Sequence, residues 1–243
     1  MKLQGAFTAL VTPMRRGEVF LDGLRELVEH QITAGIDGLV PVGTTGEAAT
    51  LTADERFKVI QTVVQVAAGR VPVIAGAGAN STAAAVEGSK LAAEAGADAL
   101  LHVTPYYNKP TQDGLLAHFA AVAEATDLPV VLYNVPGRTS CDMLAATVGK
   151  AASINNVVGI KEATGCLHRA SNVLAAVPDS FTVLSGDDFT CMPFCVLGGH
   201  GVISVVSNLV PAETAKMIRA AREGDLARAR KLHYSLLPLM ELL

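Results

Sequence analysis

The sequence predicts one (β/α)8 TIM barrel, an α/β fold, with an incomplete helical extension at its C-terminus. Three observations support this: the length, eight short apolar segments, and helical periodicity between most of them. The chain has 243 residues, half of them hydrophobic, and closed α/β barrels of about 250 residues are common. A doubly wound open sheet is the runner-up. It is disfavoured because segment 76–84 has no third glycine where a nucleotide-binding loop needs one.

Eight apolar segments, most of them rich in Val, Ile and Leu, predict the strands. Several are apolar throughout instead of alternating, which is typical of strands covered on both faces of a parallel sheet. The eight segments are 5–13, 35–43, 71–78, 97–105, 128–136, 157–164, 181–188 and 201–208.

The stretches between most of these segments have the spacing of helices. Leu24, Val28 and Ile32 lie on one apolar stripe. Thr52, followed three residues later by a glutamate, predicts a helix start with a capping box. Pro211 stands where a first helical turn would begin. Alternating strands and helices predict a parallel barrel.

The chain divides into a catalytic barrel at 1–224 and the start of a C-terminal helical region at 225–243. Polar and apolar residues in this second part have the spacing of one more amphipathic helix. Its end has no obvious covering partner within the chain, which indicates missing sequence or an interface. The apolar residues concerned are Leu236, Leu237, Leu239, Met240, Leu242 and Leu243.

Composition excludes several classes of function. The net charge is −4 and no Lys/Arg cluster stands out, so a nucleic-acid surface is not expected. No apolar run approaches the roughly 18 residues of a membrane helix, and no signal peptide is visible. We therefore expect a cytoplasmic protein.

The cysteines do not indicate a metal site or a disulfide framework. None of the four forms a CxxC pair. Cys191 and Cys195 lie in an apolar segment, and we expect buried free thiols there. His200 is the only histidine near them in sequence, which is too few ligands for a metal.

Active sites of this fold lie at the C-terminal ends of the strands, and Lys161 follows an apolar strand there. A buried ammonium is costly. Desolvation also lowers a lysine pKa, which yields the neutral amine that attacks a ketone. The alternative is a structural salt bridge to Glu162 or Asp187. Glu162 is a poor partner because adjacent strand residues point to opposite faces. Position alone leaves the catalytic and structural roles open.

Other polar residues follow neighbouring strands. Tyr133 could transfer protons beside the amine if its strand pairs with that of Lys161, or it could fill the core. Thr44 and Thr45, in a glycine-flanked loop, suit a small carboxylate, although the loop could equally be a turn. Arg138, on a loop, could bind a second carboxylate or be an ordinary surface arginine.

Three motifs together resemble the dihydrodipicolinate synthase family of class I aldolase-like barrels, which also includes N-acetylneuraminate lyase. They are Gly-Thr-Thr-Gly-Glu at 43–47, Tyr-Asn-Val-Pro-Gly-Arg-Thr at 133–139 and Gly-Ile-Lys-Glu-Ala-Thr at 159–164. The resemblance runs along the chain, from Thr-Ala-Leu-Val-Thr-Pro at 8–13 to Gly-Gly-His-Gly-Val-Ile-Ser at 198–204.

The resemblance implies a role for each site residue. Lys161 would carry pyruvate as a Schiff base, so that neither cofactor nor metal is needed. Tyr133 would relay protons, and Thr44 would link it to Tyr107, which reaches in from a neighbouring subunit. The substrate-binding residues would be Thr45 for the pyruvate carboxylate, Arg138 for the semialdehyde carboxylate, and the backbones of Gly186 and Ile203.

The implied activity is condensation of pyruvate with L-aspartate-4-semialdehyde, on the path to diaminopimelate and lysine, in a homo-oligomer: a dimer, or a tetramer built from tight dimers. The Gly-Arg-Thr of 137–139 looks like a synthase. Two alternatives stay open: a related Schiff-base 2-oxo acid aldolase resembling N-acetylneuraminate lyase, and a barrel that binds a metabolite without turnover, because fold alone does not determine substrate.

Two departures from the family carry expectations. Family members usually continue past position 243, so we expect lower thermal stability than in longer relatives. Some members are inhibited by lysine in a cleft at the dimer interface, which Asn80 and Tyr106 would fit. The other cleft positions lack a negative charge for the lysine ammonium and Arg56 would repel it, so we expect weak inhibition. The uncharged positions are Ala48, Ala49, Ala53 and Ala84.

Overall fold

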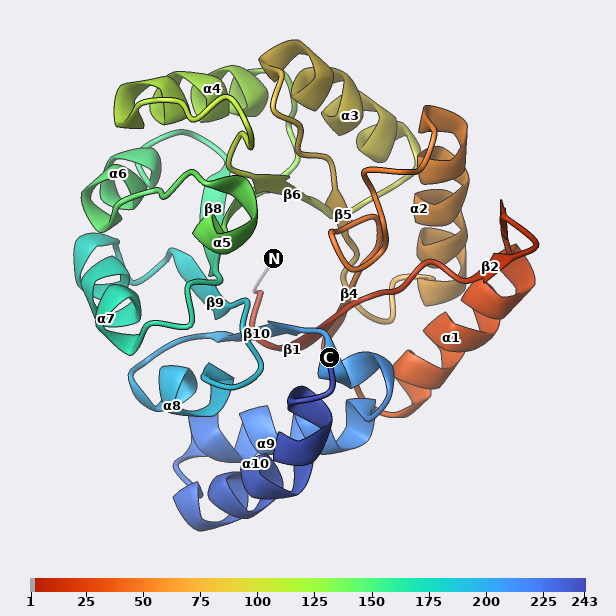
Figure 1. Cartoon of the computed structure of the whole chain (residues 1–243), viewed down its shortest axis with the longest axis vertical. Helices are drawn as coiled ribbons and strands as arrows, with labels where there is room; N and C mark the ends of the chain where they lie inside the picture. Colours follow the sequence, from red (N-terminus) through yellow and green to blue (C-terminus); the bar gives the residue numbers. More distant parts are fainter. Residues whose placement is uncertain (1–2) are drawn as a thin grey trace.

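The computed structural model describes residues 3–243 as a ring of parallel strands surrounded by helices (Figure 1). The sheet has eight strands in the order β4-β1-β10-β9-β8-β7-β6-β5. Each predicted segment contains one of them. Their bounds are β1 (Gly5–Ala9), β4 (Gly38–Val40), β5 (Ile74–Gly76), β6 (Ala99–Val103), β7 (Val130–Asn134), β8 (Val157–Glu162), β9 (Thr182–Ser185) and β10 (Gly201–Ser204).

The sheet closes between its two end strands, β4 and β5. Leu39 forms a parallel bridge with Val73, and its N–H donates to the carbonyl oxygen of Pro72 at 3.0 Å. A closed parallel sheet has no free edge, and the C-terminal ends of its strands meet at one mouth. The predicted barrel is confirmed, and the open sheet is wrong.

Helices follow the strands around the outside, as the periodicity predicts. The side chains of Thr52 and Glu55 form the expected capping box, and Pro211 is the first residue of its helix. The helices are α1 (Leu21–Thr33), α2 (Ala53–Ala67), α3 (Thr82–Glu94), α4 (Gln112–Glu124), α6 (Ala145–Ala151), α7 (Leu167–Ala176), α8 (Cys191–Val196), α9 (Pro211–Glu223) and α10 (Leu226–Met240).

Several small elements were not predicted. A hairpin joins β2 (Met14–Arg15) to β3 (Glu18–Val19), and η1 (Val206–Asn208) is a turn of 3-10 helix directly after β10. The short helix α5 (Pro136–Thr139) contains Arg138, so the expectation of a loop there was wrong. Elements of two to four residues are too short to show a hydrophobic period.

Two apolar layers stabilise the barrel. Side chains on the inner faces of the strands form the smaller one, which includes Phe7, Ile74 and Leu184. The larger one lies between the strands and the helices. Successive strand residues face opposite layers, so every second residue at a strand end faces the mouth of the barrel.

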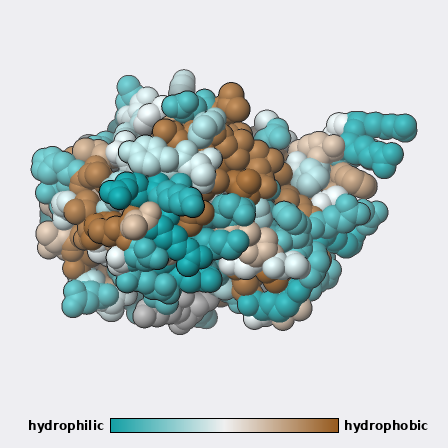
Figure 2. All heavy atoms as spheres, turned by 90° about the horizontal axis from the view of Figure 1, so that it is seen from below, coloured by the Kyte–Doolittle hydropathy of each residue, from teal (hydrophilic) through white to brown (hydrophobic). Residues whose placement is uncertain are grey.

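The C-terminal helix α10 packs against α9. Leu236 and Met240 are 5% and 3% exposed, so the expectation of an uncovered helix end was wrong for these two. Leu242 and Leu243 are 82% and 65% exposed. Seen from below, the molecular surface has hydrophobic groups set among hydrophilic ones (Figure 2). The division at 224 stays a prediction.

Among the described residues, no helix has both the length and the apolar character required to cross a bilayer.

Candidate active site

Tyr133 and Lys161 lie opposite each other at the ends of β7 and β8. The two strands pair directly, as the interpretation of Tyr133 required. The Lys161 ammonium nitrogen lies 4.3 Å from the centroid of the Tyr133 ring, within the range of a cation–π contact. These two residues are 28 positions apart in sequence, and the parallel pairing of their strands brings them together.

Lys161 is 6% exposed, and its environment weakens its basicity. Burial lowers its pKa from 10.5 to about 8, Asp188 opposes this shift with its negative charge, and Arg138 adds to it. Desolvation favours the neutral amine because an ammonium loses its hydration on burial. The strand therefore places a weakly basic amine at the mouth of the barrel.

The structure does not support the salt-bridge alternative for Lys161. Glu162 accepts hydrogen bonds from the side chain of Asn134 at 3.1 Å and from the N–H of Thr164 at 2.8 Å. Asp187 accepts from the N–H and hydroxyl of Thr190, at 2.9 and 2.6 Å. Among residues 3–243, neither carboxylate forms an ion pair with Lys161.

A partly buried polar network links the ends of β7 and β8 on the outer face of the sheet. The side-chain amide of Asn134 donates to both Glu162 and Asp142, at 3.1 and 3.0 Å. Arg169 donates to both carboxylate oxygens of Asp142, at 2.8 and 2.7 Å. The sequence interpretation assigned no role to this network. Asn134 and Glu162 directly follow Tyr133 and Lys161, so strand alternation already places them on the opposite face.

Gly186, just after β9, leaves room for the Lys161 stem. A Cβ at this position would lie 2.7 Å from Cε and 3.0 Å from Cγ of Lys161. It would also lie 2.6 Å from the Cβ of Ala163. Real Cβ atoms essentially never approach other carbons so closely, so Lys161 and Ala163 would have to move. The N–H of Gly186 donates to the Glu162 carbonyl at 2.8 Å, which fixes the loop beside β8. Glycine is therefore required here for its lack of a side chain.

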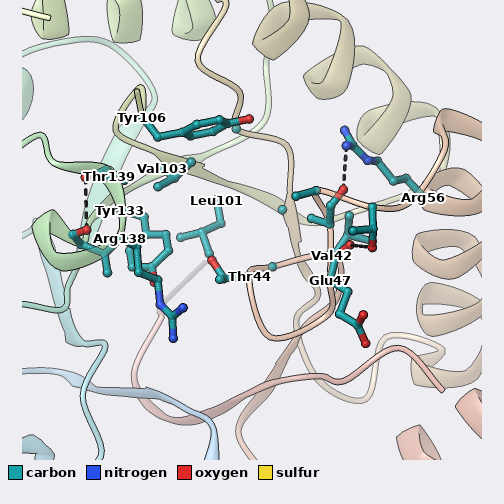
Figure 3. Close-up of a pocket in the computed structure, with 17 residues that line it drawn as sticks. Val42, Thr44, Glu47, Arg56, Leu101, Val103, Tyr106, Tyr133, Arg138 and Thr139 are labelled. Atoms are coloured by element: carbon teal, nitrogen blue, oxygen red, sulfur yellow. Dashed lines mark hydrogen bonds between the residues drawn. The ribbon is translucent and has the colours of Figure 1, made fainter. Parts of the chain in front are cut away.

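A cavity of about 380 Å³ opens above Tyr133 (Figure 3). Thr44, Tyr133 and Arg138 line it together: Thr44 from the connection after β4, Tyr133 from the end of β7 and Arg138 from α5, which follows β7. Burial raises the pKa of Tyr133, while a hydrogen bond with the Thr44 side chain and the charge of Arg138 oppose the shift. The Tyr133 phenol therefore stays protonated near neutral pH.

The Thr44 loop owes its shape to backbone contacts. Thr12 donates its hydroxyl hydrogen to the Gly46 carbonyl at 2.7 Å, and the N–H of Glu47 donates to the Thr44 carbonyl at 3.0 Å. A Cβ at Gly46 would lie 2.9 Å from the Leu10 carbonyl oxygen. The loop is thus held against β1, with Thr44 exposed toward the cavity.

The remaining predicted site residues do not line this cavity. Lys161 lies beside the Tyr133 ring, and Gly186 lies against its stem. Ile203 is buried within the inner layer of the barrel, and Thr45 is half-buried. Tyr107 is 88% exposed with a φ of +74°. Its N–H donates to the carbonyl of Thr139 at 3.4 Å, but its side chain is not part of the cavity lining.

The cavity also extends toward the cleft where we expect weak lysine binding. Ala48, Ala49, Arg56 and Tyr106 line this part. The Arg56 guanidinium donates to the carbonyl of Ala48 at 2.7 Å. Glu47 also lines the cavity, a carboxylate that the sequence interpretation left out. Weak inhibition by lysine stays a prediction.

The cysteines are free thiols. Cys191 and Cys195 are buried, as predicted. Burial raises the pKa of Cys195 to about 12 and that of Cys191 well above its usual value. Within the part of the chain that the structure describes, no three His, Cys, Asp or Glu residues are grouped to hold a metal ion.

Comparison with known proteins agrees with this arrangement. The sequence model of the dihydrodipicolinate synthetase family matches residues 2–243. A 4-hydroxy-tetrahydrodipicolinate synthase from Maridesulfovibrio salexigens is 58% identical over 240 residues, which cover 98% of this chain and 82% of the relative.

Solved structures show the same fold. The dihydrodipicolinate synthase of Aquifex aeolicus superposes with a TM-score of 0.96 at 46% identity, over 98% of this chain and 82% of that one. The enzyme of Acinetobacter baumannii, complexed with pyruvate, superposes with a TM-score of 0.97 at 45% identity, over 99% and 83% of the two chains. With its fold and nearly its whole length matched, this chain belongs to the dihydrodipicolinate synthetase family.

Proposed function

We propose that this protein is a 4-hydroxy-tetrahydrodipicolinate synthase, a lyase that condenses pyruvate with L-aspartate-4-semialdehyde. The single observation that supports this most is Lys161, buried beside Tyr133 at a strand end of the barrel. The relatives named above are synthases, so we do not propose the alternative, a 2-oxo acid aldolase that resembles N-acetylneuraminate lyase. We keep the cytoplasmic location as part of the proposal.

Lys161 is the proposed nucleophile. With a pKa of about 8, roughly one molecule in ten carries the neutral amine at pH 7, against less than one in a thousand for an unperturbed lysine. The amine attacks the ketone carbon of pyruvate, a C–N bond forms, and loss of water leaves an imine. No other cofactor takes part in this proposal.

Tyr133 and Thr44 are the proposed proton carriers. Formation of the imine requires protonation of the departing hydroxyl, and a protonated phenol beside the amine can supply that proton. The hydrogen bond between Tyr133 and Thr44 gives the phenol a neighbour with which to exchange it. We further propose that Tyr107 completes this relay in the site of a second copy of the chain.

The remaining residues are proposed to bind carboxylates. Arg138 stands at the cavity, where a guanidinium can hold the semialdehyde carboxylate with two hydrogen bonds. Thr45 would hold the pyruvate carboxylate, with backbone groups of Gly186 and Ile203 beside it. These assignments follow the family resemblance, residue by residue.

Borohydride trapping tests the proposal. Reduction of the protein in the presence of pyruvate is expected to fix an adduct on Lys161, detected by peptide mass spectrometry. The rate of adduct formation is expected to rise with pH through about 8, because the neutral amine is the reactive form.

Two controls accompany the trapping experiment. Lys161→Arg is expected to give no adduct, and a coupled assay with both substrates reports turnover. An unlabelled Lys161 in protein that turns over both substrates would refute the imine mechanism.

A further inference from the structure

Asp188 is a carboxylate at the mouth of the barrel that none of the roles above uses. It lies three residues beyond the end of β9. One of its oxygens, Oδ2, accepts hydrogen bonds from the N–H groups of Val205 and Val206, at 2.8 and 3.1 Å. These N–H groups open the helical turn η1 after β10. Asp188, which follows β9, is thus hydrogen-bonded to the backbone that follows β10.

The other oxygen, Oδ1, is buried and has no hydrogen-bond partner among residues 3–243. An unsatisfied carboxylate oxygen in a buried position costs free energy, because it has lost water without replacement. Buried groups of this kind are uncommon, and a catalytic role is one of the explanations for them. Oδ1 is therefore available to a cationic group at this end of the barrel.

Lys161 is a buried cation at the same strand ends, although it forms no direct ion pair with Asp188 among residues 3–243. Its stem passes Gly186, two residues before Asp188, so closely that a Cβ at Gly186 would touch it. β8 and β9 pair side by side, with Lys161 opposite Leu184. Asp188 is also the carboxylate whose charge acts on Lys161 and raises its pKa against the effect of burial.

The neighbouring carboxylates do not share this position. Asp187 is engaged by Thr190 through two hydrogen bonds, and its carboxyl group lies 3.6 Å from where a Cβ of Gly165 would be, on the outer part of the loop. Glu162 is bound to Asn134 on the opposite face of the sheet. Of these three carboxylates, Asp188 is the one whose charge raises the pKa of Lys161, and it also raises that of the buried Cys191 thiol.

We propose that Asp188 is a positioning residue, whose buried Oδ1 supplies the negative charge that stabilises the positively charged imine nitrogen of Lys161. The inference rests on the proposed function. Neutral amine, ketone and one proton give a protonated imine and one water, so a buried positive charge appears that the free amine lacks. A fixed carboxylate stabilises that charge without rearranging.

The same charge has opposite effects at the two stages of the reaction. Before pyruvate binds, Asp188 favours the ammonium and thereby reduces the amount of reactive amine. After dehydration it favours the protonated imine. Removing the charge should therefore move the pH dependence of imine formation to lower pH and at the same time weaken the imine. If Asp188 only anchored Val205 and Val206, its replacement would not shift the pH dependence to lower pH and weaken the imine together.

Asp188→Asn is the test, because the amide oxygen can still accept from Val205 and Val206. Adduct formation with pyruvate is measured by borohydride trapping across pH, in the full chain. We expect the acidic limb of the rate to shift to lower pH by about one unit. At about pH 9, where the free amine is mostly neutral in both proteins, we expect the pyruvate concentration for half-maximal trapping to rise about tenfold, the equivalent of one pKa unit.

Asp187→Asn is the matched control, since it removes the adjacent negative charge. We expect this variant to have the same acidic limb of the rate and the same pyruvate concentration for half-maximal trapping as the wild type. If Asp188→Asn does not fold, Asp188→Ser makes the same measurement, because its hydroxyl can also accept from these N–H groups. The inference is overturned if the Asp188 variant traps pyruvate like the wild type. It is also overturned if the Asp188 and Asp187 variants show equal shifts in the pH dependence of trapping. Wild-type protein that traps no pyruvate refutes the proposed function instead.

Discussion

At the scale of single residues, the chemistry of Lys161 depends on what surrounds its stem. Burial is the largest influence on its pKa, and Gly186 provides the space in which that burial is possible. The apolar run before Lys161 made a buried lysine predictable from sequence. The contact with Gly186 was not predictable, because it joins a residue of β8 to one that follows β9.

Gly186→Ala should therefore displace Lys161. The added Cβ would lie within 3.0 Å of two Lys161 carbons, and a shift of about 1 Å at a reacting group can lower activity about 100-fold. We expect a loss of that order in kcat/KM and slower trapping of pyruvate.

Gly137→Ala is the control for this change, because a Cβ there would meet nothing within 4 Å, although it lies next to Arg138. It should keep its activity. Activity of Gly186→Ala within threefold of wild type would contradict this account of the glycine.

At the level of elements, one histidine joins β6 to helix α3 and a second joins α3 to α4. Ser89 donates its hydroxyl hydrogen to the Ala85 carbonyl at 2.8 Å, so it accepts from His102 Nε2 at 3.1 Å. His102 Nδ1 then carries no proton and has no partner among the described residues. His118 contacts Thr82 at 2.9 Å. Burial lowers the pKa of both histidines, that of His102 to about 3.

This pair predicts acid sensitivity. The folded state keeps His102 neutral, whereas the unfolded chain binds a proton below about pH 6.5. The contribution of His102 to the free energy of unfolding is therefore fully present above pH 6.5, and it is lost as the pH drops toward 3. For His102 alone we expect a loss of about 2 kcal/mol in the free energy of unfolding between pH 7.5 and pH 5.

Urea unfolding at the two pH values measures this loss. His102→Gln keeps a donor for Ser89 and removes the titrating ring, so the loss should shrink in that variant. An equal loss in wild type and variant would show that other groups cause the acid sensitivity.

At the scale of the whole molecule, Tyr107 has a position that one chain does not explain. It is 88% exposed, on a backbone with a φ of +74°, a conformation that is uncommon for a non-glycine residue. Its role was implied by the family resemblance. Whether it acts in its own chain or in a second copy depends on how chains associate.

Subunit mixing distinguishes these possibilities. Tyr107→Phe should lower turnover about 100-fold if the phenol transfers a proton, and Lys161→Ala should abolish it. A mixed dimer of the two holds one complete site only if Tyr107 acts in the other chain. Random exchange should then restore about a quarter of the wild-type rate. Mixed dimers, verified by mass, that show no recovery would contradict the proposed role of Tyr107.

Sequence patterns predicted the barrel, the order of its strands along the chain and the residues at the strand ends. Strand segments were recognisable because strands covered on both faces are apolar throughout. Lys161, Tyr133 and Arg138 were recognisable because polar residues follow apolar runs. Short elements such as α5 and η1 were not, since hydrophobic periods need longer segments.

Only the tertiary structure decided which of these residues meet. Strand pairing places Tyr133 opposite Lys161, and the folding of β9 beside β8 brings Gly186 and Asp188 to the lysine. It also left Tyr107 outside the cavity of its own chain. The physical reason is that burial, charge interaction and steric contact depend on distances in space, which local sequence patterns do not specify.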